Sequence, residues 1–164
     1  MPPGPLSNGK AEKMQKTLII IKPDAFDRRL VGKIVSRFEA KGLQLLAMKL
    51  AAISEETAKK HYAEHEAKPF FDGLVRFITG GPVVLMVWGG GSAIAAARRL
   101  MGRTNAAEAE PGTIRGDWGL SGQFNLVHGS DSPESAEREI DLFFSPEELV
   151  ELPHSDSKWF ESPS

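Results

Sequence analysis

A single histidine, His128, stands among small turn-forming residues in the stretch FNLVHGSDSPES, residues 124–135. Shortly after it come a good helix N-cap, Ser132, and a residue that suits the first helical position, Pro133. On this local pattern alone, His128 would be the last residue of a strand. A histidine can also attack phosphorus, provided that one ring nitrogen is free and an acceptor holds the other. Glu139, about two turns into the following helix, is a candidate acceptor, although a solvated helix carboxylate is the simpler interpretation.

Four further polar residues have the chemistry to bind phosphates. An arginine fork matches phosphate oxygens in pairs, and lysine supplies a compact charge. Each of these residues, taken alone, is more simply explained as a solvated surface group, and the sequence does not show that they meet near His128. If the fold brings them together, they would suit a polyphosphate chain. They are Lys22 at the end of a predicted strand, Arg98 late in a predicted helix, Thr104 in the next loop and Arg115 in GTIRGD.

The composition excludes several other kinds of chemistry. With 164 residues, 41% of them hydrophobic and 26% charged, the chain is typical of a soluble globular protein. The absence of cysteine excludes thiolate catalysis, disulfides and zinc–thiolate sites. With a net charge of −2, the chain has no excess of positive charge that would attract nucleic acid or an anionic membrane. The longest apolar run, residues 83–88, is far too short to span a bilayer. We therefore expect no nucleic acid and no membrane as partners.

Residues 1–15 differ from the rest of the chain. They are rich in Pro, Gly, Ser and polar residues and contain no apolar segment of the kind that a secretion signal requires. The sequence therefore predicts a flexible N-terminal tail at residues 1–15, a folded domain at residues 16–164 and a cytoplasmic location.

Hydrophobic periodicity predicts an alternation of strands and helices. Residues 103–123, rich in charged and turn-forming residues, are expected to form a loop. Strands are expected at residues 17–22, 43–53, 83–88 and 124–127. Helices are expected from Asp27 to a stop at Gly42, from a cap at Ser54 through His61 and Tyr62, and at residues 71–78, 92–101 and 133–144.

This order of elements predicts an α+β fold, a ferredoxin-like βαββαβ sandwich. Its four-stranded antiparallel sheet would carry helices on its faces, with a helical hairpin inserted between the second and third strands. The same architecture occurs in enzymes, RNA-binding domains and regulatory domains, so it does not by itself indicate a function. An RNA-binding domain would need stacking aromatic residues in an RNP-type arrangement, and no stretch of the sequence matches one.

Two common nucleotide-binding motifs are incomplete or absent. The predicted strand at residues 83–88 is followed by three glycines and a helix, as in a dinucleotide-binding unit, but Ile94 stands where the last glycine of that motif belongs. No GxxxxGK[ST] loop occurs in the sequence. A nucleotide, if one binds, must therefore be held by dispersed residues.

Several short stretches follow one another along the chain: KPDAF at 22–26, HYAEH at 61–65, KPFFDGLV at 68–75, GPVVLMVW at 81–88, TN at 104–105, PGTIRGD at 111–117 and NLVHGSDS at 125–132. Together they resemble the nucleoside diphosphate kinase family, and the resemblance runs over about residues 16–160. The combination of NLVHGSDS with KPD and GTIRGD is highly specific for that family.

The resemblance implies an enzyme that transfers the γ-phosphate of a nucleoside triphosphate, typically ATP, to a nucleoside diphosphate by a ping-pong mechanism through a phosphohistidine. His128 resembles the nucleophile, and Glu139 and Ser130 resemble the groups that orient it. Mg²⁺ would arrive with the nucleotide, bridging phosphate oxygens, so no metal-binding residues are expected in the protein. The other residues carried over are Lys22, Tyr62, Arg98, Thr104 and Arg115 for the phosphates and the transferring group, Asn125 with Lys22 for the sugar hydroxyl, and Phe70, with Leu74 beside it, for stacking on the base.

The chain departs from the family pattern at Gln123-Phe124, where Gly-Arg is general, at Gly89, where an acidic residue is common, and at Ala106, where proline is usual. None of these changes removes a group assigned to the phosphates. The C-terminal extension resembles that of longer family members and favours a homo-oligomer, a hexamer rather than a tetramer. The alternative is that the chain is a non-catalytic nucleotide-binding or regulatory protein of the same fold. Such a protein would be expected to lack the histidine or its cationic neighbours.

Overall fold

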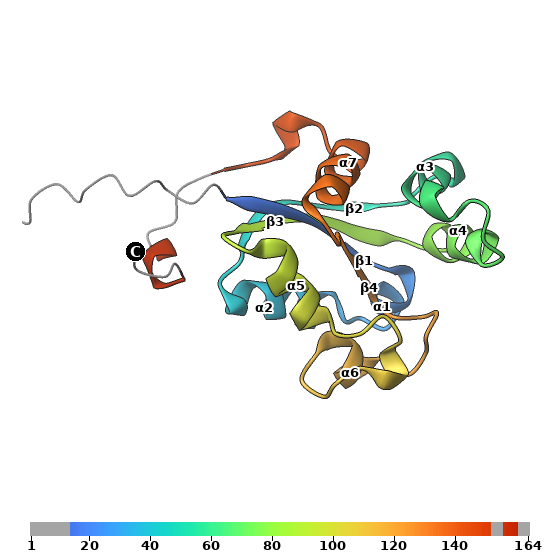
Figure 1. Cartoon of the computed structure of the whole chain (residues 1–164), viewed down its shortest axis with the longest axis horizontal. Helices are drawn as coiled ribbons and strands as arrows, with labels where there is room; N and C mark the ends of the chain where they lie inside the picture. The colour runs from blue at the N-terminus through green and yellow to red at the C-terminus, as the bar shows by residue number, and fades with distance from the viewer. Residues whose placement is uncertain (1–13, 152–155, 161–164) are drawn as a thin grey trace, which may run out of the picture.

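A computed structural model of the chain describes residues 14–151 and 156–160. At the centre of these residues lies a four-stranded sheet in the order β2-β3-β1-β4, in which every neighbouring pair of strands is antiparallel (Figure 1). The predicted α+β, ferredoxin-like fold is confirmed. The strands are β1 (Gln15–Ile21), β2 (Gln44–Ala51), β3 (Val83–Gly90) and β4 (Val127–Gly129).

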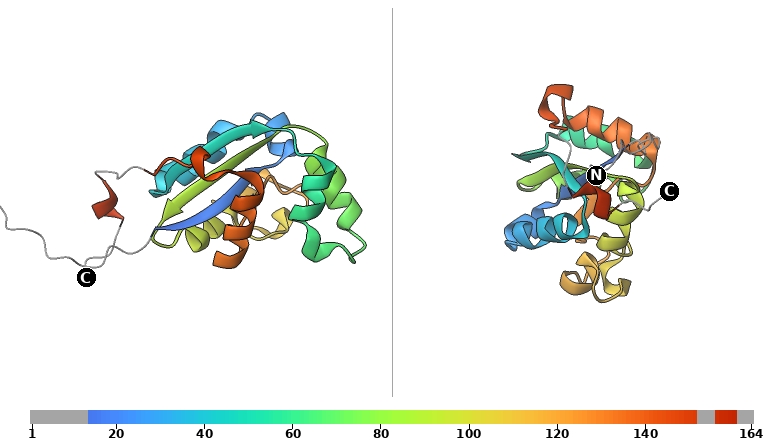
Figure 2. Two further views of the ribbon diagram at one scale, coloured as in Figure 1. Left: turned by 90° about the horizontal axis from the view of Figure 1, so that it is seen from above. Right: turned by 90° about the vertical axis from the view of Figure 1, so that its left-hand side faces the viewer.

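Helices cover both faces of the sheet (Figure 2). Leu18 and Ile20 of β1 belong to a core with residues of α3, α4 and α7, whereas Ile19 and Ile21 belong to a second core with residues of α2, α5 and α6. This division follows from the two-residue period of a strand, which points successive side chains to opposite faces. The helices are α1 (Pro23–Asp27), α2 (Val31–Lys41), α3 (Glu55–His61), α4 (Phe71–Thr79), α5 (Ala93–Met101), α6 (Ile114–Trp118) and α7 (Pro133–Phe143), with 3₁₀ turns η1 (Ala63–His65), η2 (Ala106–Glu108), η3 (Pro146–Glu148) and η4 (Ser157–Trp159).

The helical hairpin α3–α4 is inserted between β2 and β3, as predicted. Its first helix begins at the predicted cap, Ser54, whose Oγ accepts a hydrogen bond from the backbone N–H of Thr57 at 3.1 Å. The second helix buries Phe71, Val75 and Ile78 against the sheet. The hairpin projects beyond the end of the sheet (Figure 1).

The strand predicted at residues 124–127 is wrong over most of its length. β4 begins only after Leu126, which has a φ of +73°, a left-handed conformation that is uncommon for a residue other than glycine. The N–H of Leu126 donates to Asp24 Oδ2 at 3.1 Å, and its carbonyl accepts from the backbone N–H of Lys22 at 2.8 Å. Leu126 thus bonds to the segment that follows β1, and His128 lies in the middle of β4, not at its end.

Two short helices were not expected from the sequence. α1 follows β1 directly, before the position at which a helix is expected to begin, and α6 lies with η2 inside the expected loop at residues 103–123. The start of α6 is capped by Thr113, whose Oγ1 accepts from the backbone N–H of Gly116 at 2.9 Å. These helices are each five residues long, too short to show a hydrophobic period in the sequence.

The predicted N-terminal tail lies outside the described residues except for Met14 and Gln15, and Gln15 already pairs with Gly90 as the first residue of β1. Beyond η3, the backbone N–H of Val150 donates to the carbonyl of Leu46 in β2 at 2.8 Å. The parts of the predicted C-terminal extension at residues 152–155 and 161–164 lie outside the described residues.

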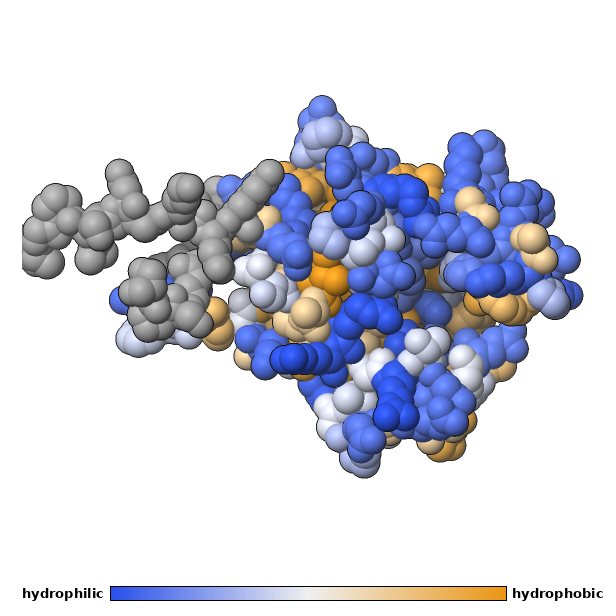
Figure 3. Space-filling model, in the orientation of Figure 1, coloured by the Kyte–Doolittle hydropathy of each residue, from blue (hydrophilic) through white to orange (hydrophobic). Residues whose placement is uncertain are grey.

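The surface drawn in Figure 3 is covered mostly by hydrophilic residues, with hydrophobic ones in small scattered groups. Among the helices of the described ranges, none combines the length and the apolar character needed to cross a bilayer.

Two departures from the family pattern have local structural correlates. Gly89 lies where a Cβ would come within 2.6 Å of Met14 Sδ, and the half-exposed ring of Phe124 packs on Phe77 with centroids 5.1 Å apart.

Candidate functional site

A pocket of about 200 Å³ lies between the helical hairpin, α5, α7 and the end of β4. Most of the predicted site residues line it, although they come from distant parts of the sequence. Three predicted residues, Ser130, Phe70 and Leu74, are not part of its lining. The predicted residues in the lining are Lys22, Tyr62, Arg98, Thr104, Arg115, Asn125, His128 and Glu139.

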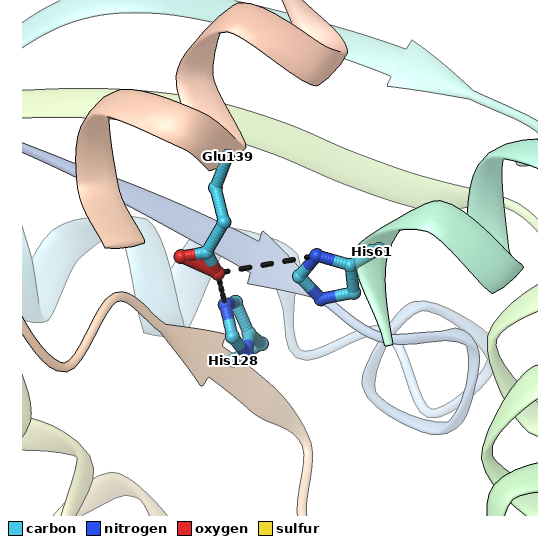
Figure 4. Close-up of side chains that lie close together, drawn as sticks. All are labelled: His61, His128 and Glu139. Atoms are coloured by element: carbon cyan, nitrogen blue, oxygen red, sulfur yellow. Dashed lines mark hydrogen bonds and ion pairs between the residues drawn. The ribbon is translucent and has the colours of Figure 1, made fainter. Parts of the chain in front are cut away.

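His128 and Glu139 meet as the sequence predicts. The Nε2 atom of His128 hydrogen-bonds Glu139 Oε1, and the carboxylate is almost fully buried on α7 (Figure 4). The helix is fixed at its start by Ser132, whose Oγ accepts from the backbone N–H of Ser135 at 3.1 Å. A neutral His128 that donates its Nε2 proton to Glu139 keeps a lone pair on Nδ1. The partly exposed ring thus offers the pocket a nucleophilic nitrogen.

His61 also lines the pocket, and the sequence analysis assigns it no role. Its ring lies edge-on to that of His128, with centroids 4.6 Å apart and an interplanar angle of 83°, and its Nδ1 is 3.9 Å from Glu139 Oε1 (Figure 4). Neither ring nitrogen makes a hydrogen bond. Burial, and then the neighbouring His128, hold the pKa of His61 far below its usual value, so the ring is neutral. The available signal in the sequence was its place beside Tyr62 in HYAEH.

A chain of hydrogen bonds fixes the opposite wall of the pocket. Lys22 Nζ donates to Asn125 Oδ1 at 2.8 Å, and Asn125 Nδ2 donates to the carbonyl of Thr104 at 2.8 Å. Burial, and then the charge of Arg115, lower the pKa of Lys22 to about 8, so Lys22 remains largely charged at neutral pH. The ammonium group is therefore held in place before any ligand arrives.

Arg115 connects several segments of this wall by hydrogen bonds. Its buried guanidinium donates to the carbonyls of Asn125 at 3.1 Å, Gly102 at 3.0 Å and Val127 at 2.6 Å. Burial, and then Arg98, lower the pKa of Arg115 to about 10, which still leaves it charged at neutral pH. We call Lys22, Thr104, Arg115 and Asn125 the cationic side of the pocket.

The other side, formed by His61, Tyr62, His128 and Glu139, we call the histidine side. The hydroxyl of Tyr62 is buried and has no hydrogen-bond partner. Burial, and then Glu139, raise the pKa of Tyr62, so this hydroxyl stays neutral and can donate to a ligand oxygen. The same pocket is lined by three cationic side chains, Lys22, Arg98 and Arg115, so the arrangement suits an anionic ligand.

The remaining predicted residues have different surroundings. Ser130 is buried, but its Oγ accepts from the backbone N–H of Leu18 at 3.1 Å, and no hydrogen bond to Glu139 is found in the described part of the chain. The structure therefore gives no direct contact for the predicted role of Ser130 in orienting the site. Phe70, 52% exposed at the start of α4, lies near His65 with ring centroids 5.6 Å apart, and Leu74 is half-buried one turn further on.

Comparison with known proteins gives a consistent result. A family model described as nucleoside diphosphate kinase matches residues 15–149. The nucleoside diphosphate kinase of Bacillus licheniformis is 58% identical over 146 residues, covering 89% of this chain and 99% of the relative. That of Archaeoglobus fulgidus is 55% identical, with 89% and 97% covered. A halophilic nucleoside diphosphate kinase from Halobacterium salinarum, solved in complex with CDP, is 51% identical, with a TM-score of 0.88 over 92% of this chain and 100% of that one.

Proposed function

The chain belongs to the nucleoside diphosphate kinase family and is an enzyme of that family, and we propose that it passes the phosphoryl group through His128. The observation that carries this proposal is the orientation of the ring. Glu139 occupies Nε2, and the other nitrogen, Nδ1, remains available beside three cationic side chains. A ring held in this way is the arrangement that nucleophilic histidine catalysis requires.

The transfer would proceed in two balanced steps. The Nδ1 lone pair of His128 attacks the γ-phosphorus of the nucleoside triphosphate, the bond to the bridging oxygen breaks, and the nucleoside diphosphate leaves with the bond electrons. The ring gains positive charge when the phosphorus–nitrogen bond forms, and the carboxylate of Glu139, bonded to the Nε2 proton, offsets that charge. A second nucleoside diphosphate then takes the phosphoryl group by the reverse attack, and His128 returns to its starting state.

Binding of the phosphates is assigned to the side chains around His128. Arg98, Arg115 and Lys22 would neutralise the phosphate oxygens, and the unpartnered hydroxyl of Tyr62 would donate to one of them. Thr104 lines the same pocket and offers its hydroxyl. Because Lys22 is already hydrogen-bonded to Asn125, we assign the same pair to the sugar hydroxyl.

The base is assigned to Phe70, with Leu74 beside it, outside the phosphate pocket. The exposed ring of Phe70 can stack on any base, because every base has a π-face, and we propose broad base tolerance on that ground. The CDP in the Halobacterium salinarum relative supports a nucleoside diphosphate as ligand. A preference above about a hundredfold, or 2.7 kcal/mol, between purine and pyrimidine diphosphates would contradict a purely stacking contact.

Magnesium is assigned to the nucleotide rather than to a protein cage. The pocket lining contains the carboxylates of Glu64, Asp131 and Glu139, and that of Glu139 is already bonded to His128. This donor set fits an ion that arrives on phosphate oxygens and takes one further oxygen at most from Asp131 at the rim. Bound in that way, Mg²⁺ supplies charge neutralisation along the phosphate chain.

Labelling tests the proposal. The protein is mixed with a γ-labelled nucleoside triphosphate, and the protein-bound label is followed before and after addition of an unlabelled diphosphate. We expect a label that is labile to acid, comparatively stable to alkali and discharged by the diphosphate, and we expect none in His128→Ala. His65→Ala, which removes another histidine of the pocket, is the matched control and should keep the label. Labelling of His128→Ala, or a wild-type protein that binds nucleotide without label, would favour the non-catalytic alternative.

A homo-oligomer, a hexamer rather than a tetramer, and a cytoplasmic location are also proposed. Support for self-association comes from β2, which forms the edge of the sheet and leaves Met48 44% and Leu50 63% exposed. Such an edge is a ready template for pairing with a second copy. Sedimentation equilibrium decides the point, and a monomer at micromolar concentration would contradict it.

A further inference from the structure

We propose that His61, His128 and Glu139 form a binding site for a transition-metal dication such as Zn²⁺, and that the bound ion switches phosphoryl transfer off. The three residues come from α3, β4 and α7 and converge behind the face of His128 that receives phosphate (Figure 4). One nitrogen of each histidine and one carboxylate oxygen all lie within 4.8 Å of one another. The proposal that the cluster binds a metal ion rests on that geometry, and the proposal that the ion inhibits transfer, the inhibitory half, rests on the proposed function of His128.

Unpartnered polar atoms at this cluster point to a ligand. Both ring nitrogens of His61 and the Oε2 atom of Glu139 are buried, and within the described part of the chain they have no hydrogen-bond partner. A buried polar atom without a partner is destabilising, so several of them in one place call for an explanation. A dication bound between the two residues would give His61 and Glu139 the partner that they lack.

The donor set selects the class of ion. Two imidazoles and one carboxylate suit zinc and its neighbours in the transition series, whereas Mg²⁺ prefers oxygen ligands. The same set, with a fourth position left for water, is common in zinc sites. Because burial keeps the His61 ring neutral, its nitrogens are available as ligands at physiological pH. Tetrahedral zinc places its ligand atoms about 3.3 Å apart, so side-chain movements on the order of 1 Å would complete the site.

Occupancy would act on the nucleophile and leave the phosphate-binding residues untouched. A metal ion at Nε2 of His128 takes the lone pair there, and the proton that Nε2 donated to Glu139 moves to Nδ1. With its lone pair used to hold that proton, Nδ1 can no longer attack phosphorus. Lys22, Arg98 and Arg115 do not belong to the metal cluster, so nucleotide binding should persist. The expected inhibition is therefore not competitive with the nucleotide.

The first arm of the test measures binding without activity. Co²⁺ is titrated into the full-length wild-type protein and into two variants, His61→Phe and His65→Phe. Phenylalanine keeps the aromatic contact of His61 with His128 and removes no hydrogen bond, since His61 makes none. His65 lies in the same pocket but outside the cluster, which makes it the matched control. We expect visible d–d absorption of a four-coordinate site in the wild type and in His65→Phe, displaced by Zn²⁺, and at least about a tenfold loss of affinity in His61→Phe.

The second arm follows phosphoenzyme formation at saturating Mg-ATP with increasing Zn²⁺, each protein being scaled to its own rate without zinc. We expect inhibition of the wild type and of His65→Phe, an unchanged dissociation constant for ADP, and at least about tenfold more Zn²⁺ for the same inhibition of His61→Phe. Zinc carried by the nucleotide affects all three proteins equally and cannot produce this difference.

The outcomes separate the two proposals. Absence of the Co²⁺ signal in the wild type, or an equal signal in all three proteins, overturns the metal site whatever the activity. A wild type that binds Co²⁺ but never forms a phosphoenzyme overturns the proposed function and leaves the metal site standing. Binding without inhibition overturns the inhibitory half. If thermal melting shows His61→Phe to be unfolded, His61→Gln replaces it, and the wild-type titration decides the existence of the site in any case.

Discussion

The cationic side and the histidine side of the pocket differ in how completely their polar groups are bonded to the protein. On the cationic side, Lys22 and Asn125 form a continuous chain with Thr104, and Arg115 binds three carbonyls. On the histidine side, the ring nitrogens of His61, the hydroxyl of Tyr62 and one oxygen of Glu139 have no hydrogen-bond partner among the described residues. The first side is therefore a preformed receptor that ligands do not need to organise. The second is a reactive surface whose polar groups become satisfied only when something binds.

Among the variants that test this difference between the two sides, Arg115→Met is expected to have the largest effect. The substitution removes the Arg115 donors from three carbonyls, of which that of Asn125 keeps the backbone N–H of Val127 at 2.8 Å, and the free energy of unfolding should fall by about 2–3 kcal/mol. Urea unfolding measures the change. Arg98→Met is the matched control, because Arg98 also faces the pocket but binds a single carbonyl, that of Gly129 at 3.1 Å, and should cost about 1 kcal/mol. Equal losses of stability in the two variants would show that the three hydrogen bonds of Arg115 do not stabilise the cationic side more than the single bond of Arg98.

Glu139→Gln tests the histidine side in the same way. Glutamine keeps the size of the side chain but loses the charge that, in the proposed mechanism, offsets the phosphorylated ring, so phosphoenzyme formation should slow by about a hundredfold. The dissociation constant for ADP should not change, because Glu139 is not among the groups assigned to the phosphates. Stopped-flow labelling and calorimetry measure the two quantities. A variant that reacts at the wild-type rate would show that the carboxylate only fills space.

A pH titration separates the effect of the Lys22 charge on the affinity for ADP from its effect on the free energy of unfolding. Burial, and then Arg115, lower the pKa of Lys22 to about 8, so the free protein loses this charge above that pH. Affinity for ADP should then fall by up to about tenfold per pH unit, and Lys22→Met should bind weakly without this dependence. Stability should move the opposite way: the unfolded chain, with the pKa at 10.5, binds the proton more tightly, so the contribution of Lys22 to the free energy of unfolding is low at neutral pH and rises between about 8 and 10.5. Wild-type affinity that is flat through this range would contradict the assignment.

The smallest effect is expected from Ala106→Pro, which would stiffen the loop next to the cationic side. Ala106 is the first residue of η2, where proline is favoured, and Asn105 before it has φ −79° and ψ 108°, angles that a residue preceding proline adopts readily. Stability should rise by about 0.4–1 kcal/mol without change in activity, as measured by thermal melting. A lower melting temperature would mean that the buried position has no room for the ring.

The sequence predicted the parts of the site that depend on local order along the chain. His128 and Glu139 are separated by a turn and a capped helix, so their meeting follows from Ser132 and Pro133. The three carbonyls that Arg115 binds come from segments that only the tertiary fold brings together, and no pattern near Arg115 indicates them.

The error at β4 arises from contacts with a distant part of the sequence. Leu126 has the residue type of a strand, but its backbone is held in a left-handed conformation by hydrogen bonds to Asp24 and Lys22, far away in the sequence. Its periodicity could not reveal that competition. Ser130, which the resemblance assigns to orienting His128, comes directly after β4, and its Oγ accepts from the backbone N–H of Leu18 in β1, the strand that pairs with β4.

The separation of the paired residues along the chain also sets when the enzyme becomes active during its synthesis. The Lys22–Asn125 bond spans 103 residues, and the bond from Leu18 to Ser130 spans 112. A nascent chain that has emerged only as far as β3 and α5 contains β1, Lys22 and His61 but neither β4 with His128 nor α7 with Glu139, and it has no phosphate pocket. Chains released early from the ribosome would therefore be inert towards nucleotides, and phosphoryl transfer begins only after almost the whole chain has been made.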